Sequence, residues 1–257
     1  FVGVTTPVQV SGLTGVTSIS ARFNHSLALI GSTALTPVTG IAPIAVAPAP
    51  VTQTPPAATS SPSGVTSVPG SVWAWGSKGA TGLGDGRAAD SNVPVPVSGL
   101  NDVVNIAAGR LHALALKSDS TVWAWGLNNG GQLGDGTTTN RNAPVQVSGL
   151  SGVVDIAAAG QHSLALKSGT VWAWGSNVLG QLGNGSTAVS SPVPVQVSGL
   201  TGVSAVAAGD SHSLALKEGG TVWAWGINSA GQLGDGSTTN RLVPVQVSGL
   251  TGVTAVA

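Results

Sequence analysis

Short stretches in which hydrophobic residues alternate with polar or small ones recur along the chain and predict β-strands. In one part of the chain they occur at 121–125, 144–147, 153–157 and 162–166. Clusters of Gly, Asn and Ser separate them, which is typical of strands joined by turns. No segment shows the hydrophobic period of an amphipathic helix. The pattern therefore predicts an all-β fold built from short strands.

The same unit of about 50 residues returns along the chain, and tryptophan marks it. The sequence Trp-Ala-Trp-Gly contains all eight tryptophans, in the pairs Trp73 and Trp75, Trp123 and Trp125, Trp172 and Trp174, and Trp223 and Trp225. A fixed period of this length is typical of repeat architectures. Four strands per period is what a blade of a β-propeller requires. The two tryptophans of a pair have the same parity on a strand and should point to one face, filling the space between neighbouring blades.

The repeat divides the chain into three regions. Residues 1–32 form a partial repeat, because 7–16 match 244–253 nearly letter for letter. Residues 33–70 hold eight of the fifteen prolines and no charged residue, which favours extended conformations and predicts a linker or an insertion. A degenerate blade is the alternative. Residues 71–257 hold the regular repeats, about four blades, and we hypothesise that 1–32 closes one propeller and 71–257 opens the next.

Four histidines, His25, His112, His162 and His212, occupy the same position in successive repeats. They could form a ring of metal ligands or bases, but no Cys or carboxylate recurs beside them to complete a site. We interpret them as structural residues that bond backbone groups at the turn before their strand. We therefore predict no metal site.

A Gly-Asp-Gly or Gly-Asn-Gly turn also recurs, with Asp85, Asp135, Asn184 and Asp235 at its centre. These side chains could hold calcium, but their spacing differs from that of calcium-binding loops. Asp and Asn also stabilise turns by bonding the backbone two residues on. The second interpretation is preferred.

Composition narrows the class of function. Charged residues make up only 7% of the chain, and nine Lys and Arg balance nine Asp and Glu. Nucleic acids and anionic membranes require clustered basic residues, so neither is an expected partner, and no apolar stretch is long enough to insert into a membrane. The chain lacks Cys, Tyr and Met, and its one glutamate is Glu218. With no catalytic set outside the repeated positions, we predict a protein that is not an enzyme and uses no cofactor.

Three motifs in fixed order resemble the repeat of the regulator of chromosome condensation family. They lie at 108–116, 122–128 and 131–136 and return in the other repeats. The resemblance implies a propeller of four-stranded antiparallel blades, usually seven. It also implies a range of functions, from nucleotide exchange on a small GTPase with chromatin binding, through inhibition of β-lactamase by a secreted bacterial member, to scaffold domains. This chain carries only about four and a half repeats, so we expect an incomplete ring that belongs to a longer chain or associates with other copies.

Residues that vary between otherwise uniform repeats are the candidates for function, because loops of successive blades share one rim. The candidate partner-binding residues are Arg110, Leu111, Asn129, Arg141, Gln161, Val178, Leu179, Asp210 and Arg241.

We therefore predict a non-catalytic interaction or self-assembling module of a bacterial protein, secreted or attached to the cell surface. Its partner would be another protein or further copies of itself, in a homo-oligomer or a longer chain. The alternative is a regulator that inhibits an enzyme or acts on a small GTPase through the loop face.

Overall fold

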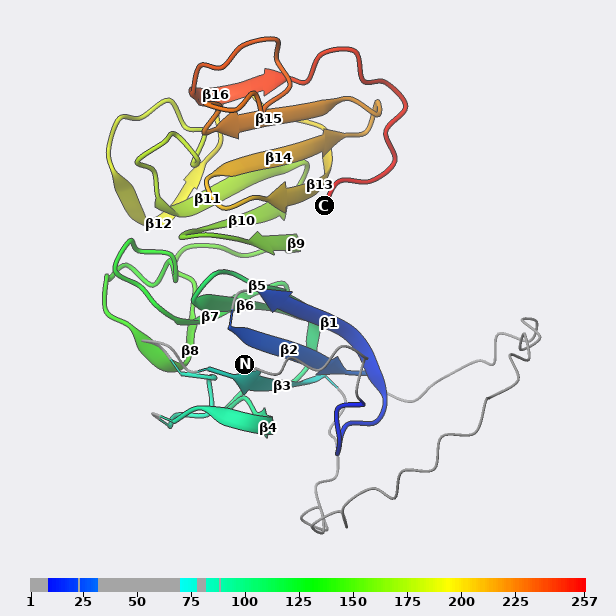
Figure 1. Ribbon diagram of the computed structural model, residues 1–257, viewed down its shortest axis with the longest axis vertical. Helices are drawn as coiled ribbons and strands as arrows, with labels where there is room; N and C mark the ends of the chain where they lie inside the picture. Colours follow the sequence, from blue (N-terminus) through cyan, green and yellow to red (C-terminus); the bar gives the residue numbers. More distant parts are fainter. Residues whose placement is uncertain (1–8, 23, 32–69, 78–81, 88) are drawn as a thin grey trace, which may run out of the picture.

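The structure, a computed structural model, describes residues 9–22, 24–31, 70–77, 82–87 and 89–257. Within these ranges every regular element is a β-strand, and the strands form four antiparallel sheets of four strands each (Figure 1). The predicted all-β fold of four-stranded propeller blades is confirmed. Among the same residues, no helix is long and apolar enough to cross a membrane.

Each sheet is called a blade here and is numbered in chain order. Blade 1 consists of β1 (Val16–Arg22), β2 (His25–Ile30), β3 (Ser71–Gly76) and β4 (Ser91–Pro96). Blade 2 consists of β5 (Val103–Ala108), β6 (His112–Lys117), β7 (Val122–Gly126) and β8 (Arg141–Gln146). Blade 3 consists of β9 (Val153–Ala158), β10 (His162–Lys167), β11 (Thr170–Ser176) and β12 (Ser190–Gln196). Blade 4 consists of β13 (Val203–Ala208), β14 (His212–Lys217), β15 (Val222–Gly226) and β16 (Arg241–Gln246).

The glycine that follows the second tryptophan in each blade has a steric cause. Gly126 pairs with His112 across β6 and β7 and has φ of 112°. A Cβ atom there would lie 2.6 Å from the carbonyl oxygen of Leu111. Only glycine fits a positive φ with such a close backbone neighbour, so the strand can leave the sheet at this residue.

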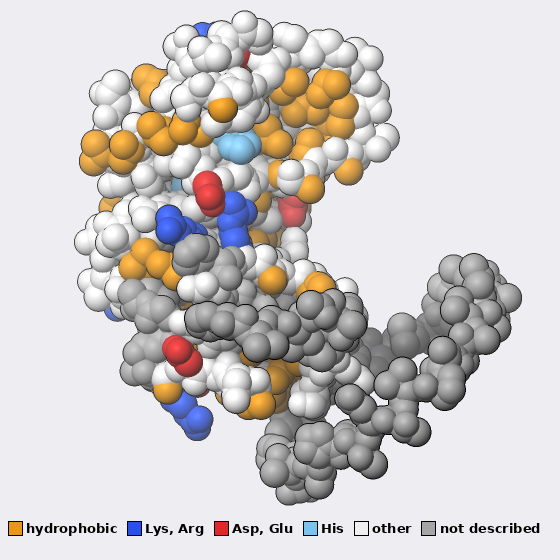
Figure 2. Space-filling model, viewed as in Figure 1, with side chains coloured by type: hydrophobic (Ala, Val, Ile, Leu, Met, Phe, Trp, Pro, Cys, Tyr) orange, Lys and Arg blue, Asp and Glu red, His pale blue; other side chains and the backbone are white. Residues whose placement is uncertain are grey.

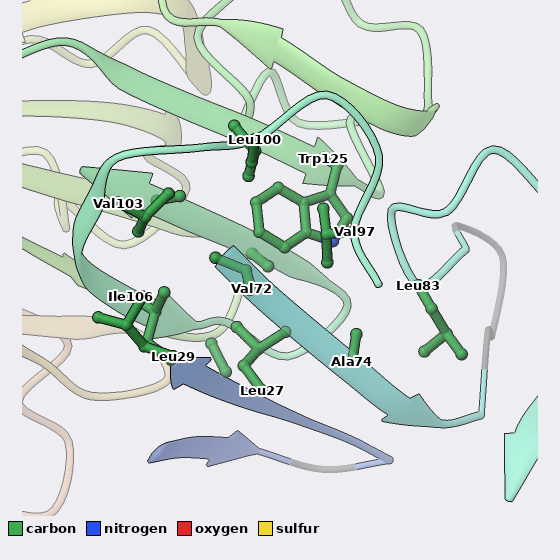
Figure 3. Close-up of a cluster of buried hydrophobic side chains, with 13 residues drawn as sticks. Leu27, Leu29, Val72, Ala74, Leu83, Val97, Leu100, Val103, Ile106 and Trp125 are labelled. Atoms are coloured by element: carbon green, nitrogen blue, oxygen red, sulfur yellow. The ribbon is translucent and has the colours of Figure 1, made fainter. Parts of the chain in front are cut away.

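Neighbouring blades pack face to face, and each such interface is called a seam here. In the seam between blades 1 and 2, Trp125 of blade 2 belongs to one buried cluster with Leu27, Leu29 and Val72 of blade 1 (Figure 3). Trp123 packs on the same cluster and is only partly buried. Trp172 and Trp174 occupy the seam between blades 2 and 3, and Trp223 and Trp225 the seam between blades 3 and 4. Both tryptophans of a pair therefore face the preceding blade, as their parity predicts.

The hypothesis that one propeller ends at 32 and another begins at 71 is wrong. The strands on the two sides of this segment belong to one blade, since β2 and β3 pair in register from His25 with Gly76 to Ile30 with Ser71. The Gly70 amide extends the ladder by donating a hydrogen bond to the Ile30 carbonyl at 2.7 Å. A long connection can replace a tight turn between two paired strands because the entropy of loop closure grows slowly with length. Residues 33–69, predicted as a linker or insertion, lie outside the described residues.

The predicted grouping of strands along the chain also needs correction. The strands expected at 121–125 and 144–147 lie in blade 2, whereas those expected at 153–157 and 162–166 lie in blade 3. A blade thus begins with the strand before the histidine and ends with the strand after the tryptophans. Counted in this way, the described residues complete four blades.

Candidate interaction surface at the loop rim

The turns between the first and second strands of blades 2, 3 and 4 meet at one rim. The amide of Arg110 donates a hydrogen bond to the carbonyl of Ala159 at 3.4 Å, which joins the turns of blades 2 and 3. A Cβ atom on Gly160 would lie 2.0 Å from the carbonyl oxygen of Asp210 in the turn of blade 4. Glycine at 160 is therefore what lets the third and fourth turns approach this closely.

A shallow pocket of about 300 Å³ opens between these turns and the long loop of blade 3. Its lining residues are Arg110, Gly160, Gln161, Ser176, Val178, Leu179, Gln181, Asp210 and Ser211. Five of the nine predicted partner-binding residues are among them, drawn from three blades. The structure thus brings together residues that sequence variation alone had selected.

The floor of the pocket is held by the buried side chain of Gln181. Its Oε1 accepts a hydrogen bond from the Leu179 amide at 2.9 Å, and its Nε2 donates to Ser176 Oγ at 3.3 Å. Val178 stands beside this arrangement with 69% of its surface exposed. An apolar side chain held on a fixed loop among polar neighbours suits contact with a partner surface.

An ion pair crosses the rim beside the pocket. Arg22, the last residue of β1 in blade 1, contacts Asp210 of blade 4 at 2.7 Å. Blades 2, 3 and 4 carry Gly109, Ala159 and Gly209 at the position of Arg22. Asp210 is exposed and Arg22 only half-buried, so solvent screens the pair and it adds little stability, but it sets opposite charges at one edge of the pocket. Figure 2 shows that charged side chains are sparse on the viewed face and that several gather near its middle.

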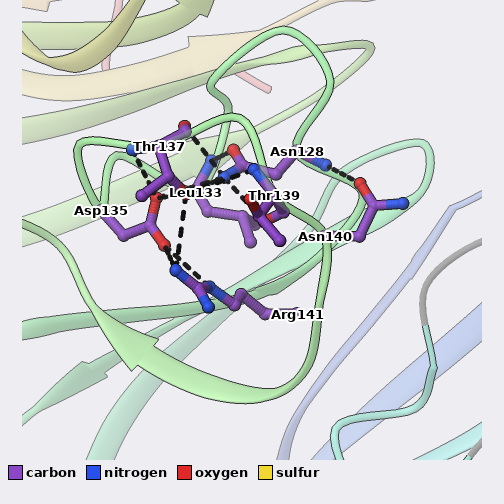
Figure 4. A network of polar contacts seen from close by, with 7 residues as sticks. All are labelled: Asn128, Leu133, Asp135, Thr137, Thr139, Asn140 and Arg141. Atoms are coloured by element: carbon purple, nitrogen blue, oxygen red, sulfur yellow. Dashed lines mark hydrogen bonds and ion pairs between the residues drawn. The ribbon is translucent and has the colours of Figure 1, made fainter.

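The Gly-Asp-Gly loops have the turn-stabilising role that was predicted. In blade 2, Asp135 Oδ1 accepts hydrogen bonds from the Thr137 amide at 3.0 Å and from its hydroxyl at 2.8 Å (Figure 4). Arg141 donates from Nε and Nη2 to Asp135 Oδ2 at 2.9 and 2.8 Å. Burial alone would raise the pKa of Asp135, but these hydrogen bonds outweigh it and lower the pKa. The side chain of Arg141, a predicted partner-binding residue, thereby bonds within its own loop.

The same network recurs in blade 4. Arg241 contacts Asp235 at 2.6 Å, and the Ser237 hydroxyl and amide take the places of those of Thr137. The hydrogen bond from the Ser237 hydroxyl is the largest of the effects that lower the pKa of Asp235, to about 2. Arg241 is thus engaged within its loop in the same way as Arg141.

The two remaining candidates lie outside the pocket. Asn129 is exposed at the position in blade 2 that corresponds to Val178 in blade 3. Leu111 is half-buried, and its carbonyl accepts a hydrogen bond from the Leu127 amide at 2.7 Å. Pocket-lining residues that sequence reasoning missed include Ser176 and Gln181. Gln181 recurs as Gln132 and Gln232 and so carried no signal of variation, whereas Ser176 does vary, since Leu127 and Ile227 occupy its position in blades 2 and 4.

His112 and His162 bond a side chain of the following blade rather than the predicted backbone groups. His112 Nε2 lies 2.9 Å from the hydroxyl of Ser163, and that hydroxyl donates to the carbonyl of Gln132. The serine proton is therefore committed, and Nε2 of the neutral ring must donate. His162 forms the same bond with Ser213 of the following blade.

Burial, followed by nearby positive charges, lowers the pKa of both His112 and His162 to about 3. The rings are consequently neutral at ordinary pH, and their hydrogen bonds to serine link neighbouring blades. In the part of the chain that the structure describes, no three metal-ligating side chains lie together.

Comparisons with known proteins agree with this architecture. The family model described as RCC1-like domain matches residues 43–257. The crystal structure of human WBSCR16 is 25% identical and superposes with a TM-score of 0.70, over 94% of this chain and 55% of that one. Yeast Prp20 is 23% identical in two crystal structures, with TM-scores of 0.69 and 0.70 over 94% of this chain and 51% and 53% of those chains. The chain spans about half the length of these structures. No match was found among curated protein sequences.

Proposed function

This chain belongs to the RCC1-like domain family, and from that premise we propose that it is a non-catalytic module that binds another protein through its loop rim. The observation that carries the proposal is the pocket in which Arg110, Gln161, Val178, Leu179 and Asp210 meet. These residues differ between repeats whose framework is nearly uniform. Varying residues that gather on one shared surface are what a specific partner requires of a repeat protein.

The solved relatives support a protein as the partner. One Prp20 structure is a complex with Kap60, and the other is described together with the binding of Prp20 to Gsp1p and histones. Because these chains share only the fold with ours, they support the class of partner and leave its identity to the rim residues. We further propose that the protein is bacterial, that it acts outside the cell or at its surface, and that copies of itself are among its partners.

The rim contains too few charges to suit nucleic acid. Arg22 is already paired with Asp210, and the pocket offers one further basic residue, Arg110. A protein surface that inserts an apolar side chain beside Val178 and pairs polar groups with Gln161 and Asp210 fits this pocket better.

Substitution at the rim tests the proposal. We expect Val178→Glu to reduce capture of the partner from an extract of the source cells by at least about tenfold, because it places a charge where an apolar contact is made. Val154→Glu is the matched control, since Val154 is 63% exposed but lies near the other end of β9, away from the turn at Gly160. Equal loss of binding in both variants, or in neither, would contradict a rim site.

The alternative of a regulator that acts on a small GTPase uses the same rim. It predicts that the wild-type chain accelerates nucleotide release from the captured protein and that Val178→Glu abolishes the acceleration. Capture without any effect on nucleotide release would favour the interaction module.

A further inference from the structure

The face of each blade that receives the preceding blade is called its incoming face, and the opposite face its outgoing face. In blades 2, 3 and 4 the incoming face is covered, and Ile106, Ile156 and Val206 are 6%, 5% and 8% exposed. Ile19 occupies the same position in blade 1 and is 75% exposed. One repeat position is thus core in three blades and surface in the fourth.

The incoming face of blade 1 is an apolar hollow of about 290 Å³. Val10, Leu13, Val16, Ile19 and Trp75 line it, together with the surface of β2. Trp75 is half-buried, whereas its counterparts in the other three blades are buried in seams. Contiguous apolar surface of this kind marks an interaction site.

The outgoing face of blade 4 has the complementary character. The equivalents of Leu164 and Leu166, which face blade 4 from blade 3, are Leu214 and Leu216. Leu214 is half-buried, although Leu164 is fully buried. Leu250 is 44% exposed, whereas Leu200 at the same repeat position is 2% exposed. Hydrophobic side chains gather over this blade at the top of Figure 2.

The polar groups of a seam are also available at these two faces and in matching positions. Between blades 3 and 4, His162 bonds Ser213, and the carbonyl of Gln181 accepts from Ser213 Oγ at 3.0 Å and Trp225 Nε1 at 2.9 Å. The corresponding donors and acceptors on the outgoing face of blade 4 are His212 and Gln232, and on the incoming face of blade 1 they are Ser26 and Trp75. Each buried polar group of a seam would find its usual partner if the two faces met.

We propose that the incoming face of blade 1 docks the outgoing face of blade 4 of a second copy of the chain, forming a fourth seam in which His212 bonds Ser26. The two faces differ, so the contact is head-to-tail and leaves a free face at each end. This inference rests on the proposal that copies of the chain are among its partners, and it concerns a different surface from the loop rim.

Identical segments at the two faces indicate how docking proceeds. Residues 10–17 and 247–254 are identical, letter for letter. Each seam holds one such segment between its blades, with Val147 and Leu150 as its buried residues in the seam between blades 2 and 3. Docking therefore displaces residues 247–254 of one copy, which follow β16, and their place is taken by the identical segment of the other. The exchange conserves the contacts made in the seam.

Native mass spectrometry over a wide range of concentration tests the proposal. The wild-type chain should pass from monomer to a series of larger species. Ile19→Asp blocks the incoming face and Leu214→Asp blocks the outgoing face, and each should weaken association by at least about tenfold. Val154→Asp is the control with similar exposure elsewhere, and tryptophan fluorescence checks that each variant is folded.

Mixing the two blocked variants gives the decisive arm. Ile19→Asp retains a good outgoing face and Leu214→Asp a good incoming face, so the mixture should form a heterodimer and stop there. A wild-type chain that stays monomeric would overturn the proposal, as would variants that still associate with themselves. Val178→Glu at the rim should leave association unchanged, which separates a failure here from a failure of the rim function.

Discussion

The seam between blades 2 and 3 and the incoming face of blade 1 present nearly the same residues in different surroundings. In the seam, Trp174 is fully buried, and its Nε1 donates to the carbonyl of Gln132 at 2.9 Å. On the open face, Trp75 lies in a hollow that no described segment of the chain fills. The comparison shows that burial in this fold is a property of neighbouring blades rather than of a single blade, as expected for a protein built from stacked repeats.

The seams also differ from one another in their polar bonds. His112 and His162 each find a serine in the following blade, but the residue in that position opposite His25 is Ala113. Burial also lowers the pKa of His25, although His25 has no serine partner in blade 2. The seam between blades 1 and 2 therefore depends more on apolar packing than the two that follow.

The largest expected difference between the closed seam and the open face is the loss of stability when their equivalent tryptophans are truncated. We expect Trp174→Ala to lower the free energy of unfolding by about 3–5 kcal/mol, because it leaves a cavity in a closed seam. Trp75→Ala should cost only about 1–2 kcal/mol, because solvent already reaches the ring. Urea denaturation of both variants against wild type measures the difference. Equal losses would mean that the incoming face of blade 1 is covered.

The dependence of stability on pH should also distinguish closed seams from open faces. The unfolded chain binds protons at its histidines below a pKa of about 6.5, whereas burial holds the pKa of His112 and His162 at about 3 in the folded chain. Stability should therefore fall as the pH drops from 6.5 towards 3, by up to roughly 1.4 kcal/mol per pH unit for each of the two residues.

Histidine variants identify the source of this slope. His162→Gln should reduce the dependence of unfolding free energy on pH, since one of the two groups no longer titrates on unfolding. His212→Gln is the comparison, because His212 is only half-buried on the open face of blade 4, although burial lowers its pKa too. Identical slopes in the two variants would contradict the assignment.

Much of the fold could be predicted because the same sequence pattern occurs four times. The parity of Trp123 and Trp125 was enough to place both in one seam. The grouping of strands could not be predicted, because a cyclic pattern has no first strand and only backbone pairing shows that β2 joins β3 across residues 33–69. From its sequence, the partial repeat at 1–32 therefore resembles the end of one unit rather than half of blade 1.

That Gln161 and Asp210 lie on one rim was predictable, because loops of successive blades share it. The ion pair of Asp210 with Arg22 joins residues 188 positions apart, and no local pattern signals it. For Arg141 a signal was present: an arginine follows the aspartate by six residues at Asp135 and again at Asp235, whereas serine stands at that distance from Asp85 and from Asn184. The recurrence of the Asp and Arg pair in two loops indicates a contact within the loop.

Hydrogen exchange of the first strands of the blades tests most directly the claim that neighbours create burial. β1 and β9 both pair with the second strand of their own blade, yet only β9 has a preceding blade packed on its incoming face. At low concentration the amides of β1 should exchange at least about tenfold faster than those of β9, and they should become protected as the concentration of the chain rises. Equal protection of the two strands at every concentration would contradict the account.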